Sequence, residues 1–113
     1  MVPGEIYLSH FPYGGSAGMK PRPTLVLAGP VGTIPEVLVA YISSVIPATP
    51  LPSDIVLGPS LPENACTNLK VVSVVRLHKL ATIHQRSVLR YLGKVSPATE
   101  AEVATKLRQL LNL

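Results

Sequence analysis

The prolines constrain the fold of this chain more than any other feature. Twelve of its 113 residues are proline, about twice the usual share. Proline lacks an amide hydrogen and fixes φ, so it ends or kinks a helix and is confined to sheet edges and turns. These prolines divide the chain into short pieces, which excludes long helices from most of it. The length fits one compact core, so we expect a single domain over residues 1–113.

The composition favours a folded chain with a substantial apolar core. Hydrophobic residues make up 47% of the chain and charged residues 14%, which is unlike a disordered sequence. The longest mostly apolar stretch, residues 37–46, is about half a membrane span and contains two serines. We therefore expect no transmembrane helix and no membrane partner. The first residues lack the basic and apolar regions of a signal peptide, so we expect a cytoplasmic location.

Alternating or β-branched apolar runs predict five or six short strands, at residues 5–11, 24–28, 37–42, 54–57, 69–76 and 80–83. The second and third runs are separated by glycines and prolines, and we expect them to pair as a hairpin of central strands. The fourth run stands among prolines and is expected to be one short strand between two loops, either at a sheet edge or flanked by turns. Residues 12–21, rich in glycine, are predicted to form a surface loop. The fold class is therefore α+β, mainly β, with a small, strongly curved sheet or barrel.

The last part of the chain changes to a helical period. A short apolar stripe predicts a helical turn closed by Gly93, and its members are Val88, Leu89 and Leu92. A second stripe predicts a C-terminal helix, with apolar residues at Val103, Leu107, Leu110 and Leu111. Two starts of this helix remain open. Ser96 before Pro97 suits an N-cap, whereas Thr99 and Glu102 have capping-box spacing.

The sequence lacks the generic motifs of most enzyme classes. It has no phosphate-binding glycine loop, no metal-ligand pair at i, i+4, no GxSxG and no CxxC. The single Cys66 cannot form an internal disulfide or a metal cage, and His10, His78 and His84 have no acidic partner nearby in sequence. We therefore expect no metal and no cofactor. The net charge of +4 favours polyanionic partners without identifying one.

The order of several segments matches a known family. A G-E-I-Y-L strand ending in F-P-Y precedes a Gly/Ser loop, K-P-R-P at residues 20–23 leads into an apolar strand, and I-S-S closes the next strand. The match continues through L-K, S-V-V-R and L-G-K-V-S to the leucine-rich end of the chain. The chain resembles the PemK/MazF family of toxin endoribonucleases over nearly its whole length. The K-P-R-P motif indicates this family only in combination with the other matching segments.

The resemblance implies an SH3-like barrel with added helices, a homodimer, and a toxin of a type II toxin-antitoxin system held in check by a cognate antitoxin. It also implies sequence-specific, metal-independent cleavage of single-stranded RNA, through 2′-hydroxyl attack that leaves a cyclic phosphate. In the family an arginine at the start of the second strand and a threonine at the end of the third act on the scissile phosphate. Matching motifs put Arg22 and Ser43 in these catalytic places. Expected substrate contacts are Ser16, Lys20 and Ser44, and further cations extend the basic surface at Arg76, Lys79, Arg86 and Arg90.

The chemistry of RNA cleavage suits these residue types. RNA supplies its own nucleophile, so an enzyme has to align the 2′-hydroxyl and stabilise charge on the phosphate. The guanidinium of Arg22 matches a phosphate, and two flanking prolines stiffen its backbone. A guanidinium stays charged in proteins, which favours charge stabilisation over proton transfer. The hydroxyl of Ser43 can hold a phosphate oxygen or the 2′-hydroxyl, or instead bond to nearby backbone.

Two departures from the family pattern leave other functions open. Serine replaces the common threonine at Ser43 and loses the methyl group that fixes the rotamer. Residues 12–21 carry no acidic side chain, although many relatives have one in this loop. One alternative is a same-fold toxin that binds DNA gyrase, which the retained K-P-R-P and I-S-S segments argue against. The other is a non-catalytic nucleic-acid-binding module, which the two departures favour.

Overall fold

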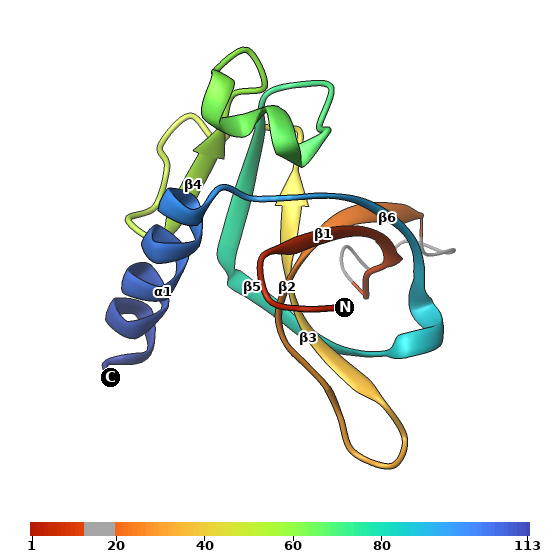
Figure 1. Cartoon of the computed structure of the whole chain (residues 1–113). Helices are drawn as coiled ribbons and strands as arrows, with labels where there is room; N and C mark the ends of the chain where they lie inside the picture. The colour runs from red at the N-terminus through yellow and green to blue at the C-terminus, as the bar shows by residue number, and fades with distance from the viewer. Residues whose placement is uncertain (13–19) are drawn as a thin grey trace.

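Six antiparallel strands form one curved sheet in the computed structural model, which describes residues 1–12 and 20–113. The strands are β1 (Glu5–His10), β2 (Pro21–Val31), β3 (Glu36–Ser43), β4 (Asp54–Leu57), β5 (Ser73–His84) and β6 (Val88–Lys94). Two short 3-10 helices, η1 (Pro62–Thr67) and η2 (Gln85–Ser87), precede the C-terminal helix α1 (Pro97–Leu111). The strand order is β4-β5-β3-β2-β1-β6 (Figure 1).

The predicted mainly β fold with a C-terminal helix is confirmed, whereas the predicted barrel is corrected to an open sheet. Strands β3 and β2 lie in the middle of the sheet, as predicted, and β4 lies at an edge, which is one of the two alternatives expected for it. In the described part of the chain the other edge is β6, and β4 and β6 do not pair. The sheet is therefore strongly curved and open rather than closed.

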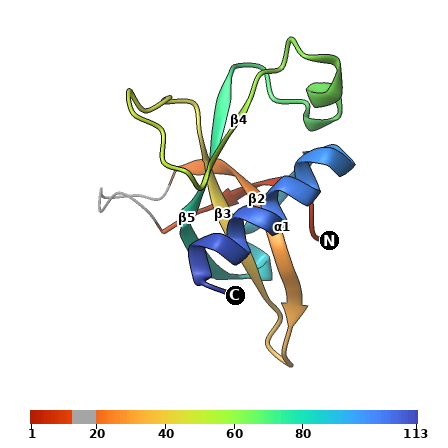
Figure 2. The ribbon, with the colours of Figure 1, turned by 90° about the vertical axis from the view of Figure 1, so that its left-hand side faces the viewer.

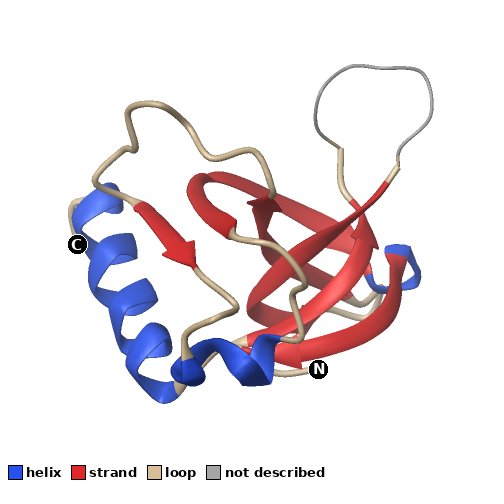
Figure 3. Cartoon of the chain, turned by 90° about the horizontal axis from the view of Figure 1, so that it is seen from above, coloured by secondary structure: helices blue, strands red, loops and turns tan. Residues whose placement is uncertain are grey.

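Both faces of the sheet are buried, so neighbouring residues of one strand belong to two different cores. Leu25 is fully buried, and Val26 beside it is 1% exposed. The first core includes Val103 of α1 and otherwise comprises Ile6, Leu25, Ala40, Ile42, Ile55, Leu57, Val75, Leu77 and Val95. The second core comprises Phe11, Val26, Val37, Val39 and Ile83. Since side chains alternate along a strand, the two cores lie on opposite faces. Helix α1 covers one of them (Figures 2 and 3).

The segment around Leu89 is a strand, so the predicted helical turn there is wrong. Strand β6 pairs antiparallel with β1, which puts Tyr7 opposite Tyr91. Their rings meet edge to face with centroids 5.3 Å apart. An isolated turn of five residues gains too few hydrogen bonds to offset helix nucleation. The unpaired edge of β1, in contrast, offers backbone partners to the same residues.

The two strands predicted at residues 69–76 and 80–83 are one long strand, β5, that begins only at Ser73. It pairs with β3 along its length, with an irregularity between Ala40 and Tyr41 of β3. Ala40 faces Leu80 and Tyr41 faces Arg76, so three residues of β5 bulge between these pairs. The polar residues His78 and Lys79 that interrupt the apolar pattern lie in this bulge, which continues the strand instead of ending it.

Helix α1 begins after Ser96, which decides between the two predicted starts. The Ser96 hydroxyl accepts a hydrogen bond from the Thr99 amide at 3.2 Å, and Pro97 occupies the first turn. Of the predicted apolar stripe, Val103 is buried and Leu107 packs against the first core, whereas Leu110 and Leu111 are exposed. None of the helices in the described residues is long and apolar enough to cross a bilayer.

Candidate active site at the ends of β2 and β3

The pairing of β2 with β3 brings Arg22 and Ser43 together. Thr24 faces Tyr41 in this antiparallel pair, and continuing the register by two residues puts Arg22 opposite Ser43. Both residues line one cavity of about 260 Å³. Two positions that are 21 apart in the chain (43 − 22) therefore meet because the hairpin folds back on itself.

The start of β2 holds Arg22 rigidly and leaves its side chain exposed. Its backbone lies opposite Ser9 of β1, and Pro21 lies opposite His10. Thr24, two residues further, donates its hydroxyl to the Tyr7 carbonyl oxygen at 3.0 Å, and its Oγ1 is also hydrogen-bonded to the Ser9 hydroxyl at 3.0 Å. No carboxylate is among the described residues that line the cavity. Arg22 is therefore a charged donor on an ordered strand, facing a space into which an anion can enter.

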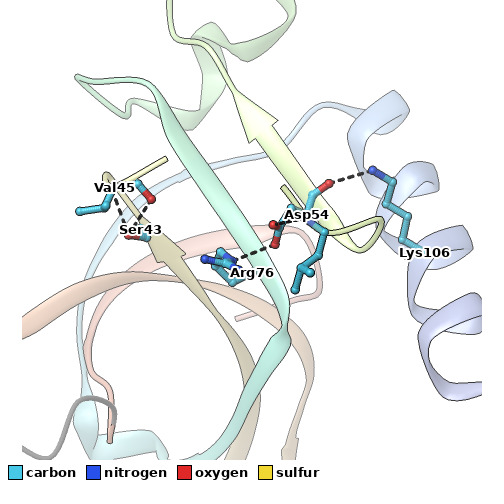
Figure 4. Close-up of polar contacts among 6 residues, drawn as sticks. Ser43, Val45, Asp54, Arg76 and Lys106 are labelled. Atoms are coloured by element: carbon cyan, nitrogen blue, oxygen red, sulfur yellow. Dashed lines mark hydrogen bonds and ion pairs between the residues drawn. The ribbon is translucent and has the colours of Figure 1, made fainter. Parts of the chain in front are cut away.

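Strand β3 ends at Ser43, whose hydroxyl is bound to nearby backbone. Ser43 Oγ accepts a hydrogen bond from the Val45 amide at 3.0 Å and makes a longer contact of 3.4 Å to the Val45 carbonyl oxygen (Figure 4). The strand does not continue through Ser44, which is exposed in the following bend and lines the same cavity. Both serines are thus at the cavity, and within residues 1–12 and 20–113 only Ser43 has its oxygen fixed by a turn.

Two further substrate contacts were predicted, Lys20 and Ser16, and the structure describes only the first of them. Lys20 is exposed directly before β2 and is not among the residues that line the cavity. Ser16 lies outside the described residues.

The cavity also contains two residues that sequence reasoning missed as site residues, Lys70 and Tyr41. Lys70 belongs to the segment between η1 and β5. This segment is shaped by a hydrogen bond from the Leu69 amide to Thr67 Oγ1 at 3.2 Å and one from Ser73 Oγ to the Val71 carbonyl oxygen at 3.0 Å. The only sequence signal for Lys70 was its place in the L-K family match.

A second cavity of about 370 Å³ adjoins the first. The two share Tyr41, Ser43 and Val45, and the second adds Arg76 and Lys79. The Lys79 ammonium lies 5.9 Å from the centroid of the Tyr41 ring, a cation-π arrangement. No carboxylate is among the described residues lining this second cavity either.

The four predicted surface cations therefore divide into two groups. Arg76 and Lys79 lie at the second cavity, whereas Arg86 in η2 and Arg90 in β6 line neither of the two cavities. His84 has a structural contact, because its Nδ1 accepts the Arg86 amide at 3.0 Å and caps η2.

The pKa of His78, which lies between Arg76 and Lys79 in the chain, is lowered by partial burial and by nearby cations. Partial desolvation, followed by the positive charge of Arg76, lowers the pKa of His78 below its usual 6.5, and Lys79 adds to the lowering. Asp54 opposes the shift without cancelling it. Beside this partial burial, the charges of Arg76 and Lys79 thus outweigh that of Asp54 around His78. Among the described residues, no group of three His, Cys, Asp or Glu side chains is placed to hold a metal ion.

Comparison with known proteins gives the same fold. The chain is similar to an endoribonuclease in complex with its cognate antitoxin from a mycobacterial species, with 22% identity, a TM-score of 0.73, and coverage of 100% of this chain and 96% of that chain. It is similar to the Mycobacterium tuberculosis toxin MazF-mt6, at 22% identity and a TM-score of 0.73, over 96% of this chain and 97% of that one. MazF from Deinococcus radiodurans shares 23% identity with a TM-score of 0.66, over 98% and 96%.

The sequence pattern of one family covers almost the whole chain. No curated protein matches the chain by sequence. A family described as PemK-like, MazF-like toxin of type II toxin-antitoxin system matches residues 2–111. The resemblance carried by K-P-R-P and I-S-S is thereby confirmed at the level of the family. This chain belongs to the PemK-like, MazF-like toxins of type II toxin-antitoxin systems.

Proposed function

We propose that this toxin is an endoribonuclease that cuts single-stranded RNA by attack of a 2′-hydroxyl on the neighbouring phosphate, leaving a cyclic phosphate. The observation that carries the proposal is the shared cavity of Arg22 and Ser43, in a chain of this toxin family. The structural neighbours described as endoribonucleases add support through their fold.

Arg22 would stabilise the charge that grows on the phosphate. During attack the non-bridging oxygens gain negative charge, and a planar guanidinium offers them parallel donors. Because Arg22 sits on a strand paired with β1, little orientational freedom is lost when the phosphate binds. Lys70, which lines the same cavity, adds a second positive charge.

Ser43 would orient the reacting groups. The hydrogen bond from the Val45 amide fixes its oxygen, while its contact with the Val45 carbonyl oxygen is long at 3.4 Å. Rotation about the C–O bond lets the hydroxyl hydrogen turn to a phosphate oxygen or to the 2′-oxygen. The backbone bond and the proposed role are therefore compatible. Because the reaction needs charge stabilisation and alignment, we propose that it requires no metal and no cofactor.

The proposed RNA path runs over both cavities. The two cavities are neighbours because they share Tyr41, Ser43 and Val45 as lining residues. The described lining of each cavity contains cationic side chains and no carboxylate. A polyanion with a charge at every nucleotide gains from such a row of positive sites.

The proposed partners follow from the same surface. A cognate antitoxin with a flexible tail would inhibit the toxin by covering the RNA groove, and the structural neighbour in complex with its antitoxin supports such a partner. We propose a homodimer with the RNA groove between subunits, acting in the cytoplasm.

The test is cleavage of a long single-stranded RNA in EDTA, with the cut ends mapped. We expect discrete cuts with cyclic phosphate ends, and at least a 100-fold loss of rate in Arg22→Ala, which is the size of effect seen when one charge-stabilising donor is removed. The matched control is Arg108→Ala, because Arg108 is an exposed arginine on α1 that lines neither cavity.

Three outcomes would contradict parts of the proposal. Undiminished cutting in Arg22→Ala would remove this residue from the mechanism. RNA binding without cutting by the wild-type protein would identify a nucleic-acid-binding module instead. Tight binding to DNA gyrase, with no action on RNA, would identify a gyrase-binding toxin.

A further inference from the structure

We propose that Asp54 is a positioning residue, which holds the Arg76 guanidinium so that it binds a second phosphate of the RNA, next to the phosphate at Arg22. This inference rests on the proposed RNA substrate and extends it to a residue that touches no RNA. Arg76 supplies the contact, and Asp54 acts only through Arg76.

Asp54 is fixed from three directions. It lies on β4 opposite Arg76 of β5, and its Oδ1 accepts a hydrogen bond from Arg76 Nε at 2.8 Å. Its Oδ2 accepts the Leu51 amide at 2.8 Å, and its main-chain oxygen accepts Lys106 Nζ of α1 at 2.8 Å (Figure 4). The Asp54 side chain is fully buried, whereas 17% of the Arg76 side chain is exposed. The carboxylate is thus a rigid support on the inner side of a partly exposed arginine.

The geometry of this ion pair leaves the outer part of the guanidinium for a ligand. Asp54 contacts Nε, the nitrogen nearest the backbone, so the two terminal amino groups lie beyond the contact. In Figure 4 Arg76 lies between Asp54 and Ser43, and Arg76 and Ser43 line the same cavity. A carboxylate that grips Nε limits the rotamers of a long side chain and so orients its terminal donors before the ligand binds.

The chemistry of the second cavity fits a phosphate. Arg76 and Lys79 both line it, and no carboxylate is among its described lining residues. The charge of Asp54 is covered by burial and by its bond to Arg76, so it does not face the incoming anion. An RNA strand carries a phosphate at every nucleotide. A strand whose scissile phosphate lies at Arg22 therefore presents another phosphate to the adjoining cavity.

The test measures binding separately from cleavage. The probe is a fluorescent single-stranded oligonucleotide of mixed sequence with 2′-fluoro riboses, which lacks the attacking hydroxyl. Asp54→Asn keeps the size of the side chain and an acceptor for the Leu51 amide, and it removes the charge that orients Arg76. We expect it to weaken binding at least threefold, and Arg76→Ala to weaken it by at least as much.

A double-mutant cycle separates positioning from general destabilisation. If Asp54 acts through Arg76, Asp54→Asn has almost no further effect on binding in the Arg76→Ala background. The matched control is Arg108→Ala, because Arg108 is an exposed cation on α1 that lines neither cavity. We expect it to leave RNA affinity unchanged.

The outcomes distinguish this inference from the proposed function. Additive losses in the double variant, or unchanged affinity in Asp54→Asn, would overturn the inference even if the wild-type protein cuts RNA. If the wild-type protein cuts nothing but binds the probe with the expected coupling, the catalytic proposal fails and the positioning role stands. A wild-type protein that neither binds the probe nor cuts RNA overturns both, and one that cuts RNA without binding the probe overturns only this inference.

Discussion

At the scale of single residues, the candidate site depends on side chains that hydrogen bonds to neighbouring groups hold in place. The Val45 amide fixes Ser43 Oγ, and the Asp54 carboxylate fixes Arg76 Nε. The site is therefore ordered before a substrate binds, which reduces the entropy lost on binding.

The first prediction separates the two serines. Ser43→Ala should lower the single-turnover cleavage rate at least tenfold, or about 1.4 kcal/mol of transition-state stabilisation. Ser44→Ala should have a smaller effect, because Ser44 lies in the exposed bend after β3 has ended. Ser43→Thr serves as the matched control, since it keeps the hydroxyl and adds the methyl group that restricts the rotamer. A larger loss in Ser44→Ala than in Ser43→Ala would assign the working hydroxyl to Ser44.

The second prediction concerns the pKa of His78, which partial desolvation and the nearby Arg76 and Lys79 lower in the free protein. A bound polyanion offsets these positive charges, so RNA binding should raise the pKa of His78. By linkage, RNA affinity should then increase as the pH falls from about 7.5 to about 5.5. NMR titration of His78 with and without the 2′-fluoro probe measures the shift. His78→Gln should reduce the pH dependence, and an equal dependence in that variant would assign it to other groups.

At the scale of elements, close backbone contacts decide where the strands lie. Strand β6 approaches η1 at Gly93, where an added Cβ would lie 2.6 Å from the Thr67 carbonyl oxygen and also meet the Cys66 carbonyl oxygen. Asn68 follows η1 in a left-handed conformation, and its side-chain amide donates to the Leu92 carbonyl oxygen at 2.7 Å. These contacts fix the segment after η1, and Lys70 in this segment lines the first cavity.

The third prediction is that Gly93→Ala destabilises the fold by about 2–4 kcal/mol, because backbone atoms rather than flexible side chains have to move. Urea unfolding measures the change. The matched control is Gly58→Ala, where the nearest atoms to an added Cβ belong to the Leu61 side chain at 3.9 Å. We expect the control to stay within about 1 kcal/mol of the wild type. Equal stabilities of the two variants would contradict the close approach of β6 to η1.

The fourth prediction tests the start of α1. Ser96→Ala removes the acceptor of the Thr99 amide and should cost about 1 kcal/mol of unfolding free energy. Glu102→Ala removes only the exposed ion pair with Lys106 and should cost about 0.2–0.5 kcal/mol. Urea unfolding of both variants compares the two caps. A larger loss in Glu102→Ala would favour a helix that starts at Thr99.

At the scale of the whole molecule, a small open sheet leaves apolar side chains in contact with solvent. Both edge strands contribute, with Val56 in β4 and Tyr91 in β6 each 48% exposed. Exposed apolar side chains also lie at the end of α1 and just after it, at Leu111 and Leu113. A chain of this size buries a limited fraction of its surface, so an association partner is expected to cover part of the remainder.

The fifth prediction is therefore a homodimer at micromolar concentration, built mainly from strand and loop residues. Sedimentation velocity and light scattering across that range measure the mass. A monomer throughout would contradict the prediction and would weaken the case for an RNA groove shared between subunits. It would leave the pairing of Asp54 with Arg76 unaffected, because both lie in one chain.

Patterns between near neighbours in the sequence were enough to predict the elements that depend on local interactions. The apolar, β-branched runs of β2 and β3 identified the central hairpin, and Ser96 with Pro97 was one of two starts predicted for α1. The K-P-R-P and I-S-S segments identified the family and the pair Arg22 and Ser43, and the register of β2 with β3 brings that pair to one cavity. Their catalytic roles stay predictions.

Only the tertiary structure decided the features that depend on partners far away in the chain. Strand β6 exists because β1 has a free edge, although its own residues have a helical spacing. Asp54 meets Arg76 across 22 positions, and Lys106 reaches Asp54 across 52. Lys70 lines the cavity because η1 packs against β6. Helical spacing, caps and turns depend on residues a few positions apart, whereas strand pairing and buried ion pairs depend on which distant segments the folded core brings into contact.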